Sequence, residues 1–202
     1  ALPIFVFTGT VFALQDINAF RKGPYLILPE NGIGMTVLWQ LDSTPTCTLE
    51  WGTDISCSDG SVQVDDYGDD KQYIYTITGL EPETVYYYRI SDGSCQPTGT
   101  FRTPPDDAVC DVRFLAHGDI QKSAANYDYV CERILTTLNA EPEYETVCLM
   151  TGDWIEDGIY SGWEEYVFNP AYDNVAEFQA RVPIMGCFGN NDDLASMQKY
   201  WP

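Results

Sequence analysis

Three short apolar runs, each ending in glycine followed by aspartate or asparagine, constrain the second half of this chain most strongly. They are residues 112–119 (VRFLAHGD), 147–153 (VCLMTGD) and 182–190 (VPIMGCFGN). A buried parallel strand reads as a continuous apolar run, and glycine lets the backbone turn where the strand stops. Because open α/β sheets gather their sites at the carboxyl ends of strands, we expect Asp119, Asp153 and Asn190 to lie together.

Two carboxylates and one carboxamide at such an edge predict a metal site with hard oxygen ligands. The alternative interpretation is three separate loops in which Asp or Asn caps a following helix. A single turn of this kind would favour the caps. Three in series favour the metal site.

The charge balance excludes several classes of function. Ten Lys and Arg residues face 31 Asp and Glu residues, and the net charge of the 202-residue chain is −21. A negative field of this size repels nucleic acids, anionic membranes and phosphorylated substrates unless cations screen it. We therefore expect no nucleic-acid partner, and we expect an extracellular or periplasmic protein.

The cysteines indicate an oxidising compartment. There are seven, without the paired CxxC spacing of a zinc ribbon. Cys47 and Cys57 are close enough in sequence for a disulfide that closes one loop. The odd count leaves at least one thiol free or paired outside the chain.

The first 14 residues, ALPIFVFTGTVFAL, are almost wholly apolar. They are too short to span a membrane and lack the basic flank of a signal peptide. Three interpretations stay open: the uncleaved end of a secretion signal, a strand of the chain's own core, or a donor strand that completes the sheet of a neighbouring copy. Donation would make the protein a filament or fibre subunit that self-associates through residues 1–14. We assign residues 1–21 to this segment.

Residues 22–105 are predicted to form a small antiparallel β-sandwich. Alternating apolar and polar residues predict strands at 36–40, 46–51 and 73–77, and Gly-containing dipeptides separate them. The stretch 80–88 (LEPETVYYY) resembles the tyrosine corner of fibronectin type III domains. In that motif Tyr86 is the residue whose hydroxyl bonds back to the backbone.

A stiff, polar boundary at Pro104-Pro105-Asp106-Asp107 separates the sandwich from residues 106–202, where strands alternate with helices. Ser123 is the expected N-cap of a helix over 124–138. Its face toward the sheet is predicted from helical spacing to contain Tyr127, Val130, Ile134 and Leu138.

Two further helical stretches, 163–168 and 174–180, lie before the third apolar run. Right-handed crossovers would then set the three strand ends side by side in a partial α/β domain.

A fibronectin-like module followed by strands ending in Gly-Asp, Gly-Asp and Gly-Asn resembles the purple acid phosphatase group of calcineurin-like metallophosphoesterases. The resemblance runs from about Gly23 to the end of the sequence and is strongest with secreted bacterial members. It implies a fibronectin III-like β-sandwich followed by the N-terminal half of an α/β metallophosphoesterase domain. It also implies two-metal hydrolysis of phosphate monoesters, with Asp119 on the first metal, Asp153 bridging both, and Asn190 on the second.

Several residues depart from the family pattern. Gln121 stands where the family has Gly or His, and Glu156 stands where the purple iron enzymes have Tyr. Asn191 replaces the His that stabilises the transition state or protonates the leaving group. As the candidate catalytic residue, Asn191 can donate a hydrogen bond but cannot exchange a proton near neutral pH.

The His ligands that complete both metal shells in the family have no counterpart in this sequence. The single His, His117, is interpreted as a hydrogen-bonded strand residue in preference to one facing the site. Oxygen ligands alone would hold Mg²⁺ or Ca²⁺ weakly, and zinc or iron less well. Either the sequence is a fragment, or a partner supplies the remaining ligands, or the site has decayed.

Two functions follow. The first is a secreted metallophosphoesterase-like protein, acting on phosphate esters but catalytically incomplete as given, with divalent metal ions of unknown identity or none. The alternative is a non-catalytic extracellular structural or fibre subunit assembled by N-terminal strand exchange.

Overall fold

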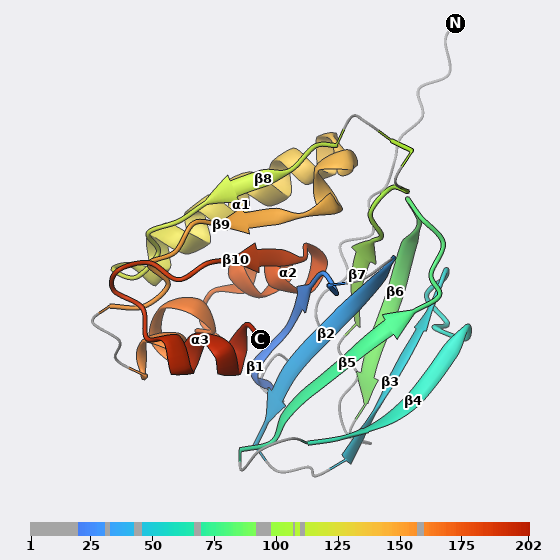
Figure 1. Cartoon of the computed structure of the whole chain (residues 1–202), viewed down its shortest axis with the longest axis horizontal. Coiled ribbons are helices and arrows are strands. Elements are labelled where there is room, and N and C mark those ends of the chain that lie inside the picture. The colour runs from blue at the N-terminus through green and yellow to red at the C-terminus, as the bar shows by residue number, and fades with distance from the viewer. Residues whose placement is uncertain are drawn as a thin grey trace, which may run out of the picture.

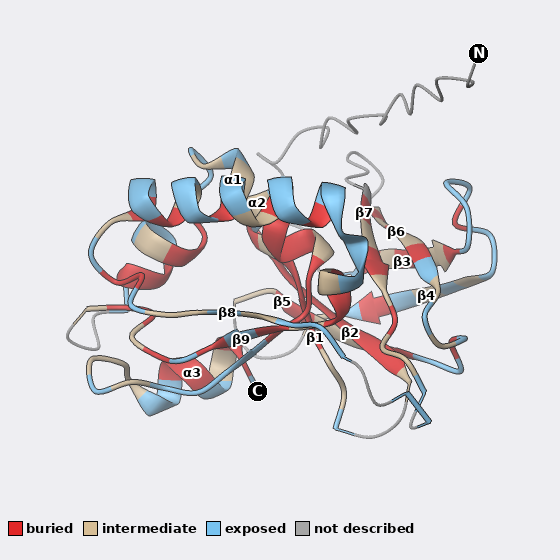
Figure 2. Ribbon diagram, turned by 90° about the horizontal axis from the view of Figure 1, so that it is seen from above, coloured by how far each residue is buried: buried red, intermediate tan, exposed pale blue. Residues whose placement is uncertain are grey.

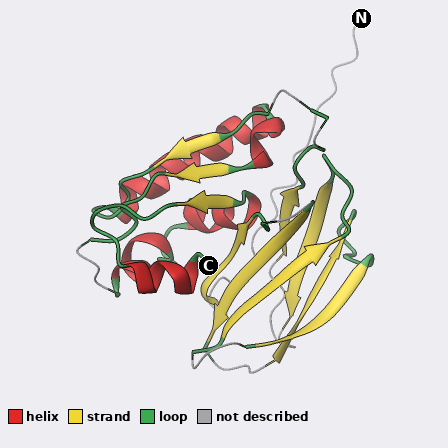
Figure 3. Ribbon diagram, in the orientation of Figure 1, coloured by secondary structure: helices red, strands yellow, loops and turns green. Residues whose placement is uncertain are grey.

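The computed structural model describes residues 20–30, 33–42, 46–66, 70–91, 98–106, 108–109, 112–156 and 160–202. In this part of the chain a β-sandwich lies beside a unit of parallel strands and helices (Figure 1). Figure 3 shows how the strands and helices divide between the two. Residues 1–14, for which a core or donor strand was among the interpretations, lie outside the described residues.

The sandwich consists of two antiparallel sheets. The smaller sheet has the order β1-β2-β5, with β1 at Phe20–Ile27, β2 at Gly34–Leu41 and β5 at Gln72–Thr78. The larger sheet has the order β4-β3-β6-β7, with strands at Gly60–Asp65, Thr46–Gly52, Val85–Ser91 and Thr98–Arg102. The strands predicted at 36–40, 46–51 and 73–77 are confirmed.

Aromatic and aliphatic side chains from both sheets form the sandwich core. Trp39 stacks on its cross-strand partner Tyr73, with ring centroids 5.3 Å apart, and Leu49, Tyr88 and Phe101 from the larger sheet are buried in the same cluster. The tyrosine corner is confirmed, because the Tyr86 hydroxyl accepts a hydrogen bond from the Glu81 backbone N–H at 3.1 Å. This bond ties the start of β6 to the preceding turn.

The expected Cys47–Cys57 disulfide is wrong. Cys47 lies near the start of β3, where its Sγ accepts a hydrogen bond from Trp39 Nε1 at 3.2 Å. Cys57 is a buried free thiol in the turn beyond the end of β3, and burial raises its pKa. An extended strand advances by about 3.3 Å per residue, so β3 holds the two sulfurs at opposite ends.

The second unit contains a three-stranded parallel sheet with the order β10-β9-β8. Its strands are β8 at Leu115–His117, β9 at Cys148–Met150 and β10 at Ile184–Gly186. The long helix α1 at Ala124–Ala140 and helix α2 at Asp173–Arg181 lie on one face of this sheet (Figure 2). The shorter helical segments are η2 at Pro142–Thr146, the π-helical turn η3 at Trp163–Val167, and α3 at Leu194–Tyr200.

Helix α1 begins as predicted, since the Ser123 side chain accepts a hydrogen bond from the Asn126 backbone N–H at 3.2 Å. Its predicted inner face is partly wrong. Val130 is exposed, and Cys131 and Leu135 are buried instead. Two apolar stripes overlap on this helix, one residue or about 100° apart. Only packing against the sheet selects between them.

Within the described part of the chain, helices cover only one face of the parallel strands, which corrects the expectation of fully buried strands. The pairing aligns Ala116, Leu149 and Met185 in one row across the sheet. All three are exposed, Leu149 by 39% and Met185 by 38%. The rows on either side point toward the helices, and there Cys148 and Met150 are buried. Alternation along each strand is therefore real, but the outward positions are apolar.

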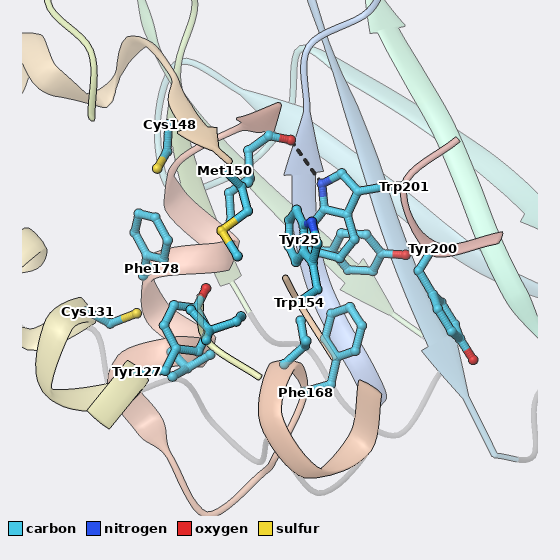
Figure 4. Packing of buried hydrophobic residues seen from close by; sticks show 14 of the residues in the cluster. Tyr25, Tyr127, Cys131, Cys148, Met150, Trp154, Phe168, Phe178, Tyr200 and Trp201 are labelled. Carbon is cyan, nitrogen blue, oxygen red and sulfur yellow. Dashed lines mark hydrogen bonds between the residues drawn. The ribbon is translucent and has the colours of Figure 1, made fainter. Parts of the chain in front are cut away.

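The two units share one core. Tyr25 and Leu38 of the sandwich belong to the same buried cluster as the aromatic residues of the second unit. Trp201 follows α3 directly, and its ring centroid lies 4.7 Å from that of Tyr25. Its Nε1 donates a hydrogen bond to the Ile184 carbonyl at 2.9 Å (Figure 4). The end of the described chain is therefore anchored between β1 and β10.

A buried lysine lies at the same junction. Lys22 on β1 is 2% exposed, and its ammonium group donates hydrogen bonds to Gln40 Oε1 at 2.6 Å and to Glu164 Oε1 at 2.8 Å. Burial lowers the pKa of Lys22, and the hydrogen bond that Lys22 donates to Glu164 opposes that shift. No pattern in the sequence indicated that this charge would be enclosed.

None of the helices in the described part of the chain has the length and apolarity that crossing a bilayer requires.

Candidate active site at the carboxyl ends of the parallel strands

The three predicted turns lie at one edge of the parallel sheet. β8, β9 and β10 point the same way, and the loops that follow them leave from the same end of the sheet (Figure 1). The Asp119 N–H donates to the Gly152 carbonyl at 3.1 Å, and the Ile120 N–H donates to the Asp153 carbonyl at 3.1 Å. The first two turns are therefore joined through their backbones.

The second and third turns approach each other even more closely. Gly152 has φ +101°, and a Cβ there would stand 2.6 Å from the Gly189 nitrogen. A Cβ on Gly189 would in turn overlap the Asp153 carboxylate. Glycine is needed at both positions for close approach, and at Gly152 for the left-handed backbone as well. Asp119 and Asp153 also adopt positive φ, 57° each, which Asp tolerates better than most residues.

The Asp153 carboxylate is already surrounded by hydrogen-bond donors. It accepts bonds from the Asn191 backbone N–H at 3.1 Å, from Asn191 Nδ2 at 2.9 Å and from Gln121 Nε2 at 3.2 Å. The structure thus brings together Asp153 and Asn191, two of the predicted site residues, and adds Gln121 to them. The side chains of Asp119 and Asn190 are exposed at the same edge.

Asp192 is the residue at this edge that sequence reasoning missed. Its two carboxylate oxygens accept hydrogen bonds from the backbone N–H groups of Asp153 at 2.9 Å, Trp154 at 2.7 Å, Ile155 at 3.0 Å and Gly189 at 2.7 Å. The only sequence signal was an acidic residue directly after the Gly189-Asn190-Asn191 turn. Nothing local indicated that it would bond to a segment nearly 40 residues away.

His117 does not face the strand-end edge. Its ring lies on the helix-covered side of the sheet, 5.5 Å from the Tyr127 ring and 5.9 Å from the Phe178 ring. Burial lowers the pKa of His117 to about 4, so the imidazole is neutral at physiological pH. The expectation of a core strand residue holds. The expectation of hydrogen bonds does not, because neither ring nitrogen has a partner among the described residues.

The oxygen atoms available at this edge decide whether a metal ion fits there. The described residues contain no group of three His, Cys, Asp or Glu side chains placed to hold a metal ion. The predicted trio offers two carboxylates and one carboxamide, and the buried Gln121 Oε1 beside Asp153 has no partner in the described chain. An ionised carboxylate has about four acceptor positions, and N–H donors take three of those on Asp153. The arrangement fits one hard cation better than a bridged pair.

Fold and site edge together define a class of protein: a β-sandwich of fibronectin type III topology followed by a parallel α/β unit with an acidic strand-end edge. Residues 23–103 match the family described as the purple acid phosphatase N-terminal domain. The chain thus resembles purple acid phosphatase-like proteins, as its residues predicted.

The solved structure of PhoD is similar to this chain, with a TM-score of 0.59 and 14% sequence identity. The match covers 86% of this chain, and so extends beyond the sandwich, but only 39% of the PhoD chain. At this identity the likeness concerns the fold alone. No curated protein sequence matches the chain.

Proposed function

We propose that this chain is part of a secreted metallophosphoesterase-like protein, located outside the cell or in the periplasm, that hydrolyses phosphate monoesters at a two-metal site. Asp119, Asp153 and Asn190 would hold one of the two ions, and the second would need ligands from outside the described residues. The observation that carries the proposal is the junction of the three Gly-Asp and Gly-Asn turns at one sheet edge. Their backbones are hydrogen bonded or in van der Waals contact, so that Asp119, Asp153 and Asn190 belong to one small region.

The exposed face of the parallel sheet supports the finer part of this proposal, that residues 106–202 are one half of a larger α/β domain. Parallel sheets are normally covered on both faces. Here the apolar row of Ala116, Leu149 and Met185 is exposed among the described residues. A further layer from polypeptide outside this sequence would bury this row and bring the missing ligands to the same edge.

In the complete protein, Asp119, Asp153 and Asn190 would hold the metal. A divalent cation there would supply positive charge beside the phosphate ester and its leaving group. Asn191 would act as a neutral donor. One hydrogen of its side-chain amide is committed to Asp153 Oδ2, and the second is available to a phosphate oxygen. Gln121 would hold the orientation of the Asp153 carboxylate through its amide N–H.

Titration with Mn²⁺, followed by calorimetry or electron paramagnetic resonance, tests this proposal on the chain as it stands. We expect weak, saturable binding that falls at least tenfold in Asp119→Asn and Asp153→Asn. Glu132→Gln on the outer surface of α1 makes the same change in charge and should bind like the parent. Absence of saturable binding, or equal affinity in Asp153→Asn, would contradict the proposal.

Turnover provides a second measurement. The chain alone should not hydrolyse p-nitrophenyl phosphate with zinc, manganese or iron, because it offers no imidazole ligand at this edge. A metal-dependent rate that Asp153→Asn abolishes would show that the ligand set is already sufficient, and would contradict the incomplete site proposed here.

A non-catalytic extracellular structural or fibre subunit is the second candidate, and the environment of Asp153 favours it. Three N–H donors occupy this carboxylate, and Asn191 cannot act as a proton donor to a leaving group. Self-association would run through residues 1–14. Deleting them should then leave a monomer in analytical ultracentrifugation, and unchanged assembly would remove this candidate.

A further inference from the structure

Asp192 joins two of the strand-end turns through one carboxylate. Oδ1 accepts from the backbone N–H groups of Trp154 and Ile155, and Oδ2 accepts from those of Asp153 and Gly189. Three of the four donors lie in the turn after β9, and the fourth lies in the turn after β10. A single side chain therefore fixes the position of one turn relative to the other.

The connection is reciprocal. Asp153, in the turn after β9, accepts from the backbone and side-chain N–H groups of Asn191 in the turn after β10. Each turn thus supplies a carboxylate to the amides of the other. We call this arrangement of Asp153, Asn191 and Asp192 the carboxylate clasp.

Asp192 has no acceptor capacity left for a ligand. Each of its oxygens already accepts two N–H bonds, which uses the lone pairs of an ionised carboxylate. Hydrogen bonds from N–H groups to an ionised acceptor are shorter and stronger than neutral ones, and these four measure 2.7–3.0 Å. An asparagine at this position would keep one oxygen but turn its NH₂ group toward two of the same N–H donors.

The geometry points to Asp192 as a positioning residue for the candidate site. We infer that it sets the position of Asp153 and Asn190 through the clasp, and that metal affinity depends on it although it touches neither metal nor substrate. This inference rests on the proposed function, since it names what holds the ligands of that site. Partners that orient metal ligands typically change affinity by 10–100-fold when they are mutated.

The test compares Asp192→Asn with Asp193→Asn in the 202-residue chain. Asp193 is the adjacent carboxylate and caps α3 through the Ser196 N–H at 2.8 Å, a role that Asn performs equally well. Both variants lose one negative charge in the same loop. Mn²⁺ affinity is measured well below the melting temperature, so that it reports on folded protein. We expect a loss of at least about tenfold in Asp192→Asn and little change in Asp193→Asn.

Amide hydrogen exchange gives the second measurement. In the parent, the N–H groups of Trp154 and Ile155 should exchange slowly although they lie outside the strand ladder, and in Asp192→Asn they should exchange at least tenfold faster. Amides within α1 should be unaffected. If Asp192→Asn does not fold, slow exchange at these two amides in the parent still supports the clasp, and fast exchange there overturns it.

The outcomes separate this inference from the proposed function. Parent protein that binds no Mn²⁺ overturns the proposed function, and the positioning role with it. Parent and Asp192→Asn binding Mn²⁺ equally well overturns the positioning role alone and leaves the proposed function standing.

Discussion

The antiparallel sheet β1-β2-β5 and the parallel sheet β8-β9-β10 reverse the usual pattern of burial. Antiparallel sheets commonly expose one face to water, whereas parallel sheets are covered on both. Here every residue of β2 is buried, because one face packs in the sandwich core and the other against the aromatic residues of the α/β unit. Among the residues that the structure describes, the parallel sheet instead leaves Leu149 and its neighbours in the row exposed. The outer face of the β1-β2-β5 sheet is therefore buried by the α/β unit. The parallel sheet of that unit has one apolar face that no described residue covers to the same extent.

The strongest test of this difference between the sheets is to place a charge on each face of β9 in turn. Met150→Lys puts an ammonium group into the buried cluster and should cost more than about 4 kcal/mol, enough to abolish cooperative unfolding. Leu149→Lys, one residue earlier, points into the exposed row and should change the free energy of unfolding by less than about 0.5 kcal/mol. Urea unfolding followed by tryptophan fluorescence measures both.

Binding of a hydrophobic dye checks the same row independently. The parent should bind the dye, and Leu149→Lys should reduce that binding. Equal destabilisation by the two lysines would mean that the outer row is covered in solution, and the contrast between the sheets would then be wrong.

The shared core predicts that the two units unfold together. Trp201→Ala removes a ring whose centroid lies 4.3 Å from a ring centroid of Trp154 and 4.7 Å from that of Tyr25. The free energy of unfolding should fall by about 3–5 kcal/mol, and unfolding should remain a single transition. Ile55→Ala, at an exposed position in the sandwich, serves as the control and should have little effect. Two separate transitions, with the sandwich unaffected by Trp201→Ala, would show that each unit is stable alone.

The hydroxyls of Tyr88 and Tyr86 allow a hydrogen bond between the two units to be compared with a hydrogen bond inside the sandwich. Tyr88 donates to the Ala180 carbonyl at 2.8 Å from a fully buried position, and Tyr88→Phe should cost about 1–3 kcal/mol because that carbonyl loses its partner. Tyr86→Phe removes the acceptor of the Glu81 N–H in the more open corner and should cost about 1 kcal/mol or less. Thermal unfolding of the two variants gives the order, and the reverse order would contradict this prediction.

The smallest expected effect concerns Glu164, and it depends on pH. The hydrogen bond from Lys22 lowers the pKa of Glu164, so this carboxylate stabilises the fold above its unfolded pKa of about 4.3 and loses that contribution as pH falls through the lower folded value. Because the Glu164 side chain is 46% exposed, we expect Glu164→Gln to cost only about 1 kcal/mol at pH 7. The difference from the parent should begin to shrink as pH falls below about 4.3, and it should vanish only below the lowered folded pKa of Glu164. A cost that persists unchanged at pH 3 would mean that charge is not its source.

Much of the local structure could be predicted from the sequence. Alternation identified three sandwich strands, the LEPETVYYY stretch identified the corner formed by Tyr86, and Ser123 marked the start of α1. The runs ending in Gly-Asp and Gly-Asn indicated parallel strands whose turns meet at one edge. These features depend on backbone preferences and on neighbours within about ten residues, which the sequence specifies directly.

The tertiary structure alone decided which side of each element is covered and what the polar groups at the site bond to. Val130 and Cys131 both fit an apolar stripe along α1, and only one of them is buried. Lys22 could equally have faced solvent. Asp192 could have capped the following helix, α3, instead of binding the amides after β9. In each case the outcome depends on a segment far away in sequence: the sheet behind α1, Glu164 across the junction, and the amides after β9. The free energy of these contacts arises only when distant segments pack together, so no local pattern encodes it.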